Sequence, residues 1–188
     1  MHAAATTESI FRGDIADLPS RIDLSAHITP ERFAIEKERI WRRAWLAIGH
    51  TQELPHKGSY FVYDIPTFEM SLLVVRGQDD RVRAFHNVCR HRGNKVVRSG
   101  RGTRPNFTCN FHGWVYDAQG ELKLITDEKE FEDVDRATLG LMPVHAEVWN
   151  TLIFVNLAPT PPCTLAEWLG TLHGQYDGYF EGREKVAA

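Results

Sequence analysis

The first regular pattern of hydrophobic and polar positions along the chain lies in residues 33–45 and has a helical period. Apolar side chains return there at three- and four-residue spacings: Phe33, Ile40, Trp41, Ala44 and Trp45. Just upstream, Thr29 can cap a helix, Pro30 suits its first position, and Glu31 suits the positive end of its dipole. The pattern predicts a helix that starts at residue 30 and uses both tryptophans for core packing. The first 28 residues show little periodicity and are expected to run over a surface.

After Gly58 the pattern changes to short β-branched and aromatic runs. Turn-forming groups such as Asp117-Ala118-Gln119-Gly120 separate these runs. Strands are predicted over residues 60–65, 70–75, 82–87, 106–109, 114–116, 122–124, 144–149 and 152–156. Strands this short, with turns this frequent, indicate an antiparallel sandwich or barrel. The predicted fold class is therefore mostly β.

A second helical pattern follows the strands. Pro159-Thr160-Pro161-Pro162 ends the β region, because proline cannot sit inside a central strand. An apolar stripe at helical spacing comes next: Leu165, Trp168, Leu169 and Leu172. This helix needs a surface to lie against, on this domain or on a partner. We therefore divide the chain into an N-terminal segment with a helix (1–40), a β domain (41–158), and a linker with a helix (159–188).

Composition and charge narrow the class of protein. The 188 residues are 43% hydrophobic and 25% charged, as in an ordinary soluble globular protein. A formal net charge of −3 gives no reason to expect a nucleic-acid partner or an anionic membrane surface. The N-terminus lacks the basic start and apolar core of a secretory signal, and no apolar run approaches the length of a spanning helix. We expect a cytoplasmic protein.

The number and surroundings of the cysteines favour metal binding over disulfide bonds. The chain has three of them, Cys89, Cys109 and Cys163, which is a poor basis for a disulfide framework. In a reducing compartment, cysteines accompanied by histidines more often bind metal. Cys163 has no histidine beside it and is expected to be an inert thiol.

Two short motifs carry the candidate chemistry. They are Cys89-Arg90-His91-Arg92-Gly93 and Cys109-Asn110-Phe111-His112-Gly113-Trp114, so each offers one thiolate and one imidazole. In a Rieske [2Fe–2S] centre, one iron takes two cysteines and the other takes two histidines. Two loops that each give one ligand to each iron would clamp such a cluster from opposite sides. The spacing therefore predicts a Rieske cluster held by Cys89, His91, Cys109 and His112.

Residues around these ligands have expected supporting roles. Gly93 and Gly113 let the backbone turn tightly and bring amide N–H groups toward sulfur. Such hydrogen bonds, together with burial, tune the potential of a cluster. Phe111 and Trp114 are expected to shield its buried side.

A structural zinc site is the competing interpretation, since two cysteines and two histidines also satisfy tetrahedral zinc. Zinc fingers usually carry a C-x2–4-C knuckle and pair their histidines elsewhere. Here cysteines and histidines alternate along the chain. The order favours iron–sulfur over zinc.

The two motifs resemble the N-terminal Rieske domain of the large (α) subunit of aromatic-ring-hydroxylating oxygenases, which are Rieske non-heme iron enzymes. Asn87 fits the family pattern N-x-C-x-H-R-G, which adds Asn87 and Arg92 to the expected surroundings of the cluster. The resemblance covers roughly residues 30 to 157. It includes Trp41-Arg42-Arg43-Ala44-Trp45, Ile48-Gly49-His50, Glu53-Leu54-Pro55, Glu147-Val148-Trp149 and Ile153-Phe154-Val155-Asn156. Asn150-Thr151 departs from the glycine-containing pair that is usual there.

The resemblance implies an oxidoreductase, often with a trimeric α assembly, in the bacterial cytoplasm. A reductase, sometimes through a ferredoxin, would supply electrons to the cluster, which passes them to a mononuclear non-heme Fe(II) where O2 is activated. That iron belongs to a catalytic domain and is held by two histidines and a carboxylate. No convincing triad of this kind is found among the remaining histidines. We therefore expect no catalytic residues here, and residues 159–188 to lead toward a catalytic domain absent from this chain.

A stand-alone Rieske ferredoxin-like carrier is the alternative within the same chemistry. Respiratory Rieske subunits carry an additional cysteine pair, and the corresponding positions here are Asn94 and Phe111. Their serine that donates to a cluster sulfide aligns with Trp114, whereas Tyr116 keeps the aromatic hydroxyl. These differences predict a potential toward the lower end of the Rieske range of about −150 to +300 mV. Helices at both ends favour a domain within a larger oxygenase.

Basic residues crowd the first ligand motif and the segment after it: Arg90, Arg92, Lys95, Arg98, Arg101 and Arg104. A solvated loop face explains this run adequately. A docking patch for an acidic electron donor explains it as well, since such charges raise association rates at low salt. The sequence leaves both interpretations open.

Overall fold

A computed structural model of the chain describes residues 24–25, 28–131, 134–176, 178–179 and 182. The chain forms two compact units, residues 1–35 and 36–188, and each is described by itself. The first unit contains most of α1 (Pro30–Glu36), a helix that begins at the predicted residue. The predicted course of residues 1–28 lies almost entirely outside the described residues.

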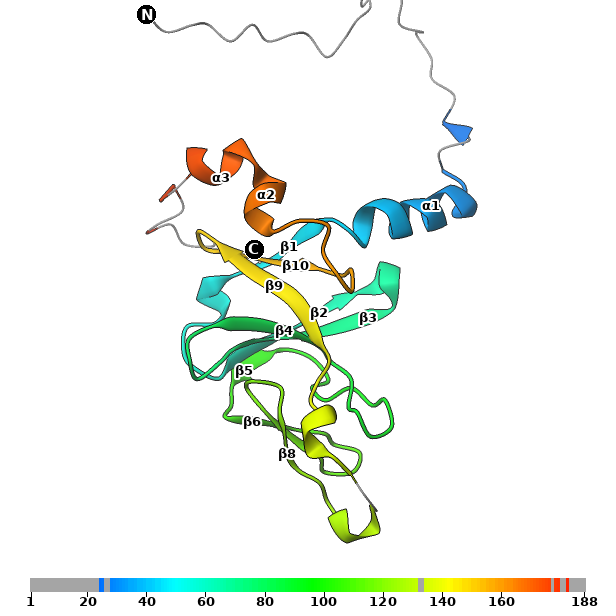
Figure 1. Cartoon of the computed structure of the whole chain (residues 1–188), viewed down its shortest axis with the longest axis vertical. Helices are drawn as coiled ribbons and strands as arrows, with labels where there is room; N and C mark the ends of the chain where they lie inside the picture. Colours follow the sequence, from blue (N-terminus) through cyan, green and yellow to red (C-terminus); the bar gives the residue numbers. More distant parts are fainter. Residues whose placement is uncertain (1–23, 26–27, 132–133, 177, 180–181, 183–188) are drawn as a thin grey trace, which may run out of the picture. The chain divides into compact units, whose positions relative to one another are not determined.

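The second unit is built on antiparallel strands, which confirms the expected fold class (Figure 1). One sheet has seven strands in the order β1-β10-β9-β4-β3-β2-β5, and a smaller sheet has the order β6-β7-β8. The larger sheet contains β1 (Trp45–His50), β2 (Ser59–Ile65), β3 (Met70–Arg76), β4 (Val82–His86), β5 (Arg101–Thr103), β9 (Pro143–Trp149) and β10 (Leu152–Asn156). The smaller contains β6 (Asn106–Thr108), β7 (Val115–Asp117) and β8 (Leu122–Leu124). The eight predicted strands are all present, with ends within one residue of those expected.

Strand β3 lies at the centre of the packing and explains where the ligand motifs sit. Its residues Leu72 and Val74 belong to one apolar cluster, while Leu73 and Val75 belong to another, and all four are fully buried. A strand covered on both faces reads as a continuous apolar run rather than an alternating one. The cluster around Leu73 and Val75 also contains Cys89 and Cys109 and continues into the small sheet. The two ligand motifs are thereby tied to the rigid core of the domain.

Two strands were not predicted, and in each case the cause is a pairing that no local pattern reveals. Trp45 begins β1 and pairs with Asn156 of β10, although its spacing from Trp41 suggested a continuing helix. A π-helical turn, η3 (Lys37–Trp41), ends the helical region before that strand. Core packing is confirmed for Trp45, which is 5% exposed, but is wrong for Trp41, which is 46% exposed. Strand β5 contains no large apolar residue and exists because it pairs with β2.

The predicted C-terminal helix is divided into α2 (Leu165–Leu169) and α3 (Thr171–Gln175), because Gly170 between them has a φ of 54°. Leu165 is buried against Trp45 and Phe154, so α2 lies on this domain. Figure 1 shows α2 and α3 near β9 and β10, at the end of the second unit away from the small sheet. Within the described part of the chain, every helix falls short of the length and apolar content that crossing a bilayer requires.

Short 3-10 turns complete the second unit: η4 (Thr51–Glu53), η5 (Pro66–Phe68), η6 (Glu128–Glu130) and η7 (Arg136–Thr138). The predicted hairpin turn between β7 and β8 is also present, with Gly120 N–H donating to the carbonyl of Asp117 at 3.1 Å. Gly120 has a φ of 83° and faces the ring of Phe85.

Gly120→Ala should destabilise the protein strongly. An added Cβ would lie 2.4 Å from Cε1 of the buried Phe85 ring. A left-handed backbone costs about 1–2 kcal/mol for alanine and overpacking about 1–3 kcal/mol more. We expect a total near 3 kcal/mol, which lowers Tm by about 6–12 °C in a chain of this size. The matched control is Gly100→Ala, where φ is 90° but nothing lies within 4 Å. Equal losses in Tm would contradict the steric explanation.

Candidate metal centre

The two ligand loops share one backbone design. One starts at Cys89 and the other at Cys109, and a glycine is the fifth residue of each. In both loops the glycine N–H donates to the carbonyl of the cysteine at 3.0 Å, and the cysteine N–H donates to the carbonyl of the sixth residue at 2.8 Å. Gly93 and Gly113 have φ values of 75° and 72°, a conformation that glycine adopts without strain. The same Cys-x3-Gly loop therefore occurs twice, with the histidine shifted by one position.

Asn87 holds the first loop in place. Its side chain is fully buried, and its Oδ1 accepts the N–H of Val97 at 2.9 Å. Its Nδ2 donates to the carbonyl of Val97 at 2.7 Å and to the hydroxyl of Ser71 on β3 at 3.1 Å. This one side chain joins the start of the loop region to its end and both to the sheet. The second loop is closed by the pairing of β6 with β7.

The four predicted ligands come together as two like pairs. Cys89 and Cys109 are free thiols, 3% and 2% exposed, and each is a hydrogen-bonding neighbour of the other. The rings of His91 and His112 lie with centroids 4.5 Å apart. Among the described residues, no three His, Cys, Asp or Glu side chains are grouped so as to hold one metal ion. The arrangement suits two adjacent irons better than one tetrahedral zinc.

One buried atom of the site has the surroundings expected of a metal ligand. Nδ1 of His91 is buried and has no hydrogen-bond partner in the described structure. A buried polar atom without a partner is costly, so a native structure normally supplies one. A metal ion bound at this nitrogen would satisfy it, since neutral imidazole is a common metal ligand.

Each cysteine sulfur is contacted by a donor from the region of the other loop. The hydroxyl oxygen of the buried Tyr116 lies 3.3 Å from Sγ of Cys89 and accepts the backbone N–H of Arg90 at 3.0 Å. Because that N–H must be the donor, the tyrosine proton is available to the sulfur. Nδ2 of Asn94 lies 3.8 Å from Sγ of Cys109. Asn94 was not expected to have this contact, although its place as sixth residue of the loop could have indicated it.

The protonation tendencies of these groups agree with the contacts. Burial raises the pKa of the Cys89 thiol, and burial together with Cys89 raises the pKa of Tyr116, which keeps the proton it donates. Burial also opposes ionisation of Cys109, but the N–H groups of Phe111 and Asn94 lower its pKa overall. Burial is the main cause that lowers the pKa of His91, and the nearby His112 and Arg92 lower it further. The neutral imidazole that binds metal is thereby favoured.

Aromatic rings cover one side of the site. The buried Trp114 stacks on His91, with centroids 4.9 Å apart and planes within 8°. Phe131 meets His91 edge-on at 5.5 Å and Trp114 at 5.8 Å. Phe111, by contrast, is 56% exposed, so the expectation that it shields the buried side is wrong. Phe131 was missed because nothing in its acidic sequence neighbourhood marks it as a neighbour of the motifs.

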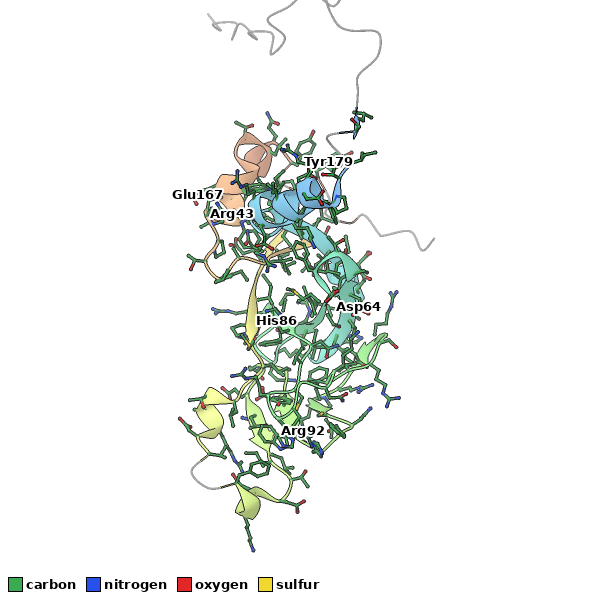
Figure 2. All side chains as sticks on the ribbon, turned by 90° about the vertical axis from the view of Figure 1, so that its right-hand side faces the viewer. Arg43, Asp64, His86, Arg92, Glu167 and Tyr179 are labelled. Carbon is green, nitrogen blue, oxygen red and sulfur yellow. The ribbon has the colours of Figure 1, made fainter. Side chains whose placement is uncertain are left out.

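Phe111 instead lies on the outer side, beside His112 at a centroid distance of 3.9 Å. The guanidinium of Arg92 lies over the Phe111 ring at 5.7 Å and so connects the two loops. Figure 2 shows Arg92 toward the end of the second unit that bears the small sheet, with Arg43 and Glu167 toward the opposite end. The site therefore sits at one tip of this unit.

A β domain in which paired loops present two thiols and two imidazoles has the features of a Rieske iron–sulfur protein. Comparison with known proteins agrees, because the family model of the Rieske [2Fe-2S] domain matches residues 44–144. The chain belongs to this family, and the cofactor is a Rieske [2Fe–2S] cluster. The alternative of a structural zinc site is set aside.

Similar proteins are α subunits of Rieske oxygenases, matched in their N-terminal Rieske region. The glycine betaine monooxygenase oxygenase subunit of Chromohalobacter salexigens is 36% identical over 159 residues, covering 85% of this chain and 35% of that protein. A naphthalene 1,2-dioxygenase structure is 31% identical with a TM-score of 0.72, covering 83% and 35%. A quaternary ammonium Rieske monooxygenase structure, described with inter-subunit electron transfer, is 27% identical with a TM-score of 0.71, covering 78% and 40%. The chain thus spans about a third of the length of the curated relative.

Proposed function

We propose that this chain is the electron-transferring part of a Rieske oxygenase α subunit, in which Cys89 and Cys109 hold one iron and His91 and His112 hold the other. The observation that carries the proposal is the pairing of thiol with thiol and imidazole with imidazole across two loops of the same design. When bound, the cluster supplies reversible one-electron transfer.

The surrounding residues have distinct tasks in this proposal. Asn87 and the loop hydrogen bonds fix the four ligands before the cluster binds, which limits reorganisation during electron transfer. Tyr116 and Asn94 donate toward the sulfurs and stabilise negative charge there. Trp114 and Phe131 keep water from the covered face of His91. Residues 41–158 form the cluster domain in this view, and 159–188 lead toward the catalytic domain.

The wider assembly follows from the family. We propose a reductase or ferredoxin as electron donor, a cytoplasmic location, and a trimeric α assembly in which the electron passes to a mononuclear Fe(II) of a catalytic domain. Inter-subunit electron transfer in the similar quaternary ammonium monooxygenase supports this order of events. Similar proteins include an aromatic dioxygenase and a glycine betaine monooxygenase. Aromatic-ring hydroxylation and oxidation of a quaternary ammonium compound are accordingly the two candidate reactions of the complete enzyme.

An anaerobic reductive titration tests the electron-transfer role. The purified chain should take up one electron and release it fully on reoxidation, with the visible spectrum changing in proportion. These 188 residues by themselves should not consume O2 together with an aromatic or quaternary ammonium compound. A chain with no reversible electron uptake would contradict the proposal, and so would substrate oxidation by this chain alone.

Tyr116→Phe should lower the reduction potential of the cluster. The substitution removes the donor to Sγ of Cys89, and that hydrogen bond stabilises the more negative, reduced form. A loss of about 1 kcal/mol corresponds to about 40 mV for one electron. A spectroelectrochemical titration measures the shift. Tyr63→Phe on β2 is the control and should leave the potential unchanged. If wild type, Tyr116→Phe and Tyr63→Phe all had the same reduction potential, Tyr116 would not have this role.

A further inference from the structure

The two halves of the cluster region carry opposite charge. Residues 81–116 contain eight Arg or Lys and no Asp or Glu, whereas residues 117–135 contain eight Asp or Glu and two Lys. The net charge of −3 for the whole chain conceals this separation. The second ligand loop lies where the basic segment meets the acidic one. The positive charges of the basic segment are therefore the ones that could attract an acidic molecule to the site.

The basic side chains are arranged along one exposed border of the domain. From Lys95 to Arg104 the chain runs beside β2, because Lys95 Nζ lies 2.9 Å from Oδ1 of Asp64 and Arg104 N–H donates to the carbonyl of Gly58. Arg101 begins β5 between these points and pairs with β2. Strand β5 is the last strand of its sheet, so its outer edge is not covered by another strand of that sheet. Arg90 and Arg92 extend this border into the first ligand loop.

Most of this positive charge is not neutralised within the described structure. Arg90 and Arg98 are exposed and have no acidic partner among the described residues. Arg92 and Arg104 lie over the rings of Phe111 and Tyr60, which leaves their charge uncompensated. Arg101 is 72% exposed and has one long contact, 3.8 Å, to Glu53. Lys95 has a close carboxylate partner in Asp64.

We propose that this basic edge is the docking surface for an acidic electron-donor protein. It is formed by Arg90, Arg92, Lys95, Arg98, Arg101 and Arg104. The inference rests on the proposed function, and it adds the face of approach and the charge of the partner. Attraction to the edge, which includes Arg90 and Arg92 of the first ligand loop, brings the donor's cofactor close to that loop. Complementary charge of this kind acts mainly on the rate of association.

Charge reversal tests the proposal in the complete, cluster-loaded chain. The double variant Arg98→Glu/Arg101→Glu leaves the proposed ligands and their donors untouched. Stopped-flow measurements would follow reduction of the oxidised chain by a reduced, acidic plant-type [2Fe–2S] ferredoxin. At low ionic strength we expect the second-order rate to fall about tenfold or more, and the difference from wild type to shrink as salt screens the charges. Wild-type rates at low salt in this variant would overturn the docking surface.

Two controls separate the possible failures. Arg39→Glu/Arg43→Glu makes the same change in charge at two exposed residues in and just after η3, outside this edge, and should leave the rate within about twofold. A small neutral reductant, photoreduced deazaflavin, should reduce wild type and the edge variant equally. If the edge variant is slow with both reductants, damage to the site explains the result and the docking proposal is wrong. If wild type accepts no electron from either reductant, the proposed function itself fails.

Discussion

Replacing Cys109 with serine should leave the protein without a Rieske cluster. The two cysteines are expected to supply both protein ligands of one iron, and serine cannot provide the soft thiolate that iron–sulfur clusters select. Cys89→Ser should have the same effect, because the two buried thiols are neighbours in the same apolar cluster. Purified variants should be colourless, with iron and acid-labile sulfide near zero. The size of this effect makes it the most decisive single substitution.

The third cysteine of the chain supplies the matched control. Cys163 lies outside both loops, and its backbone carbonyl accepts Nε1–H of Trp45 at 3.0 Å, a contact that does not involve the thiol. Cys163→Ser should keep the full iron and sulfide content of wild type. Far-UV circular dichroism of all three variants would show whether the β fold is retained. A coloured, iron-loaded Cys109→Ser protein would contradict the ligand assignment.

Asn87→Ala should cause a large loss of stability although Asn87 is not a proposed ligand. The substitution leaves the N–H and carbonyl of Val97 and the hydroxyl of Ser71 without their partner in a fully buried position. Each buried group left unsatisfied costs about 1–3 kcal/mol. We expect a total near 3 kcal/mol and a Tm lower by about 6–12 °C, measured by differential scanning calorimetry of the cluster-loaded chain. The first ligand loop should also lose its cluster more readily during purification.

Asn106→Ala is the control for this experiment. Asn106 is exposed on β6, so its truncation should change stability by no more than about 0.5 kcal/mol. If Asn87→Ala were as stable as Asn106→Ala, the buried hydrogen bonds would not hold the loop. The role assigned to Asn87 would then be wrong.

The strands that carry their own apolar pattern were predictable, and those that depend on a partner were not. A run such as Leu72 to Val75 can be recognised as a strand from the sequence, because a strand buried on both faces consists mostly of β-branched and aliphatic residues. Strand β5 has the sequence Arg-Gly-Thr and is defined only by its pairing with β2. Trp41 and Trp45 lie one helical turn apart in sequence, yet the second is taken into β1 by pairing with β10. Tertiary pairing overrode local periodicity at that point.

The candidate site shows the same division. Ligand types and spacing can be read from the motifs, because cluster chemistry demands two thiolates and two imidazoles. The neighbours that come from elsewhere cannot be read in this way. Phe131 reaches His91 and Trp114 from a loop seventeen residues beyond Trp114 in sequence. The hydroxyl of Tyr116 was expected near the cluster, and the structure adds that it contacts Sγ of Cys89, while Asn94 contacts Sγ of Cys109.

The central claim is that one diiron cluster is bound by sulfur on one iron and by nitrogen on the other. Pulsed electron paramagnetic resonance of the reduced chain, prepared with ¹⁵N-labelled histidine, tests it most directly. We expect a paramagnetic reduced cluster coupled to two histidine nitrogens, in a protein containing two irons and two sulfides per chain. A diamagnetic protein that contains zinc, or a reduced cluster without histidine coupling, would contradict it.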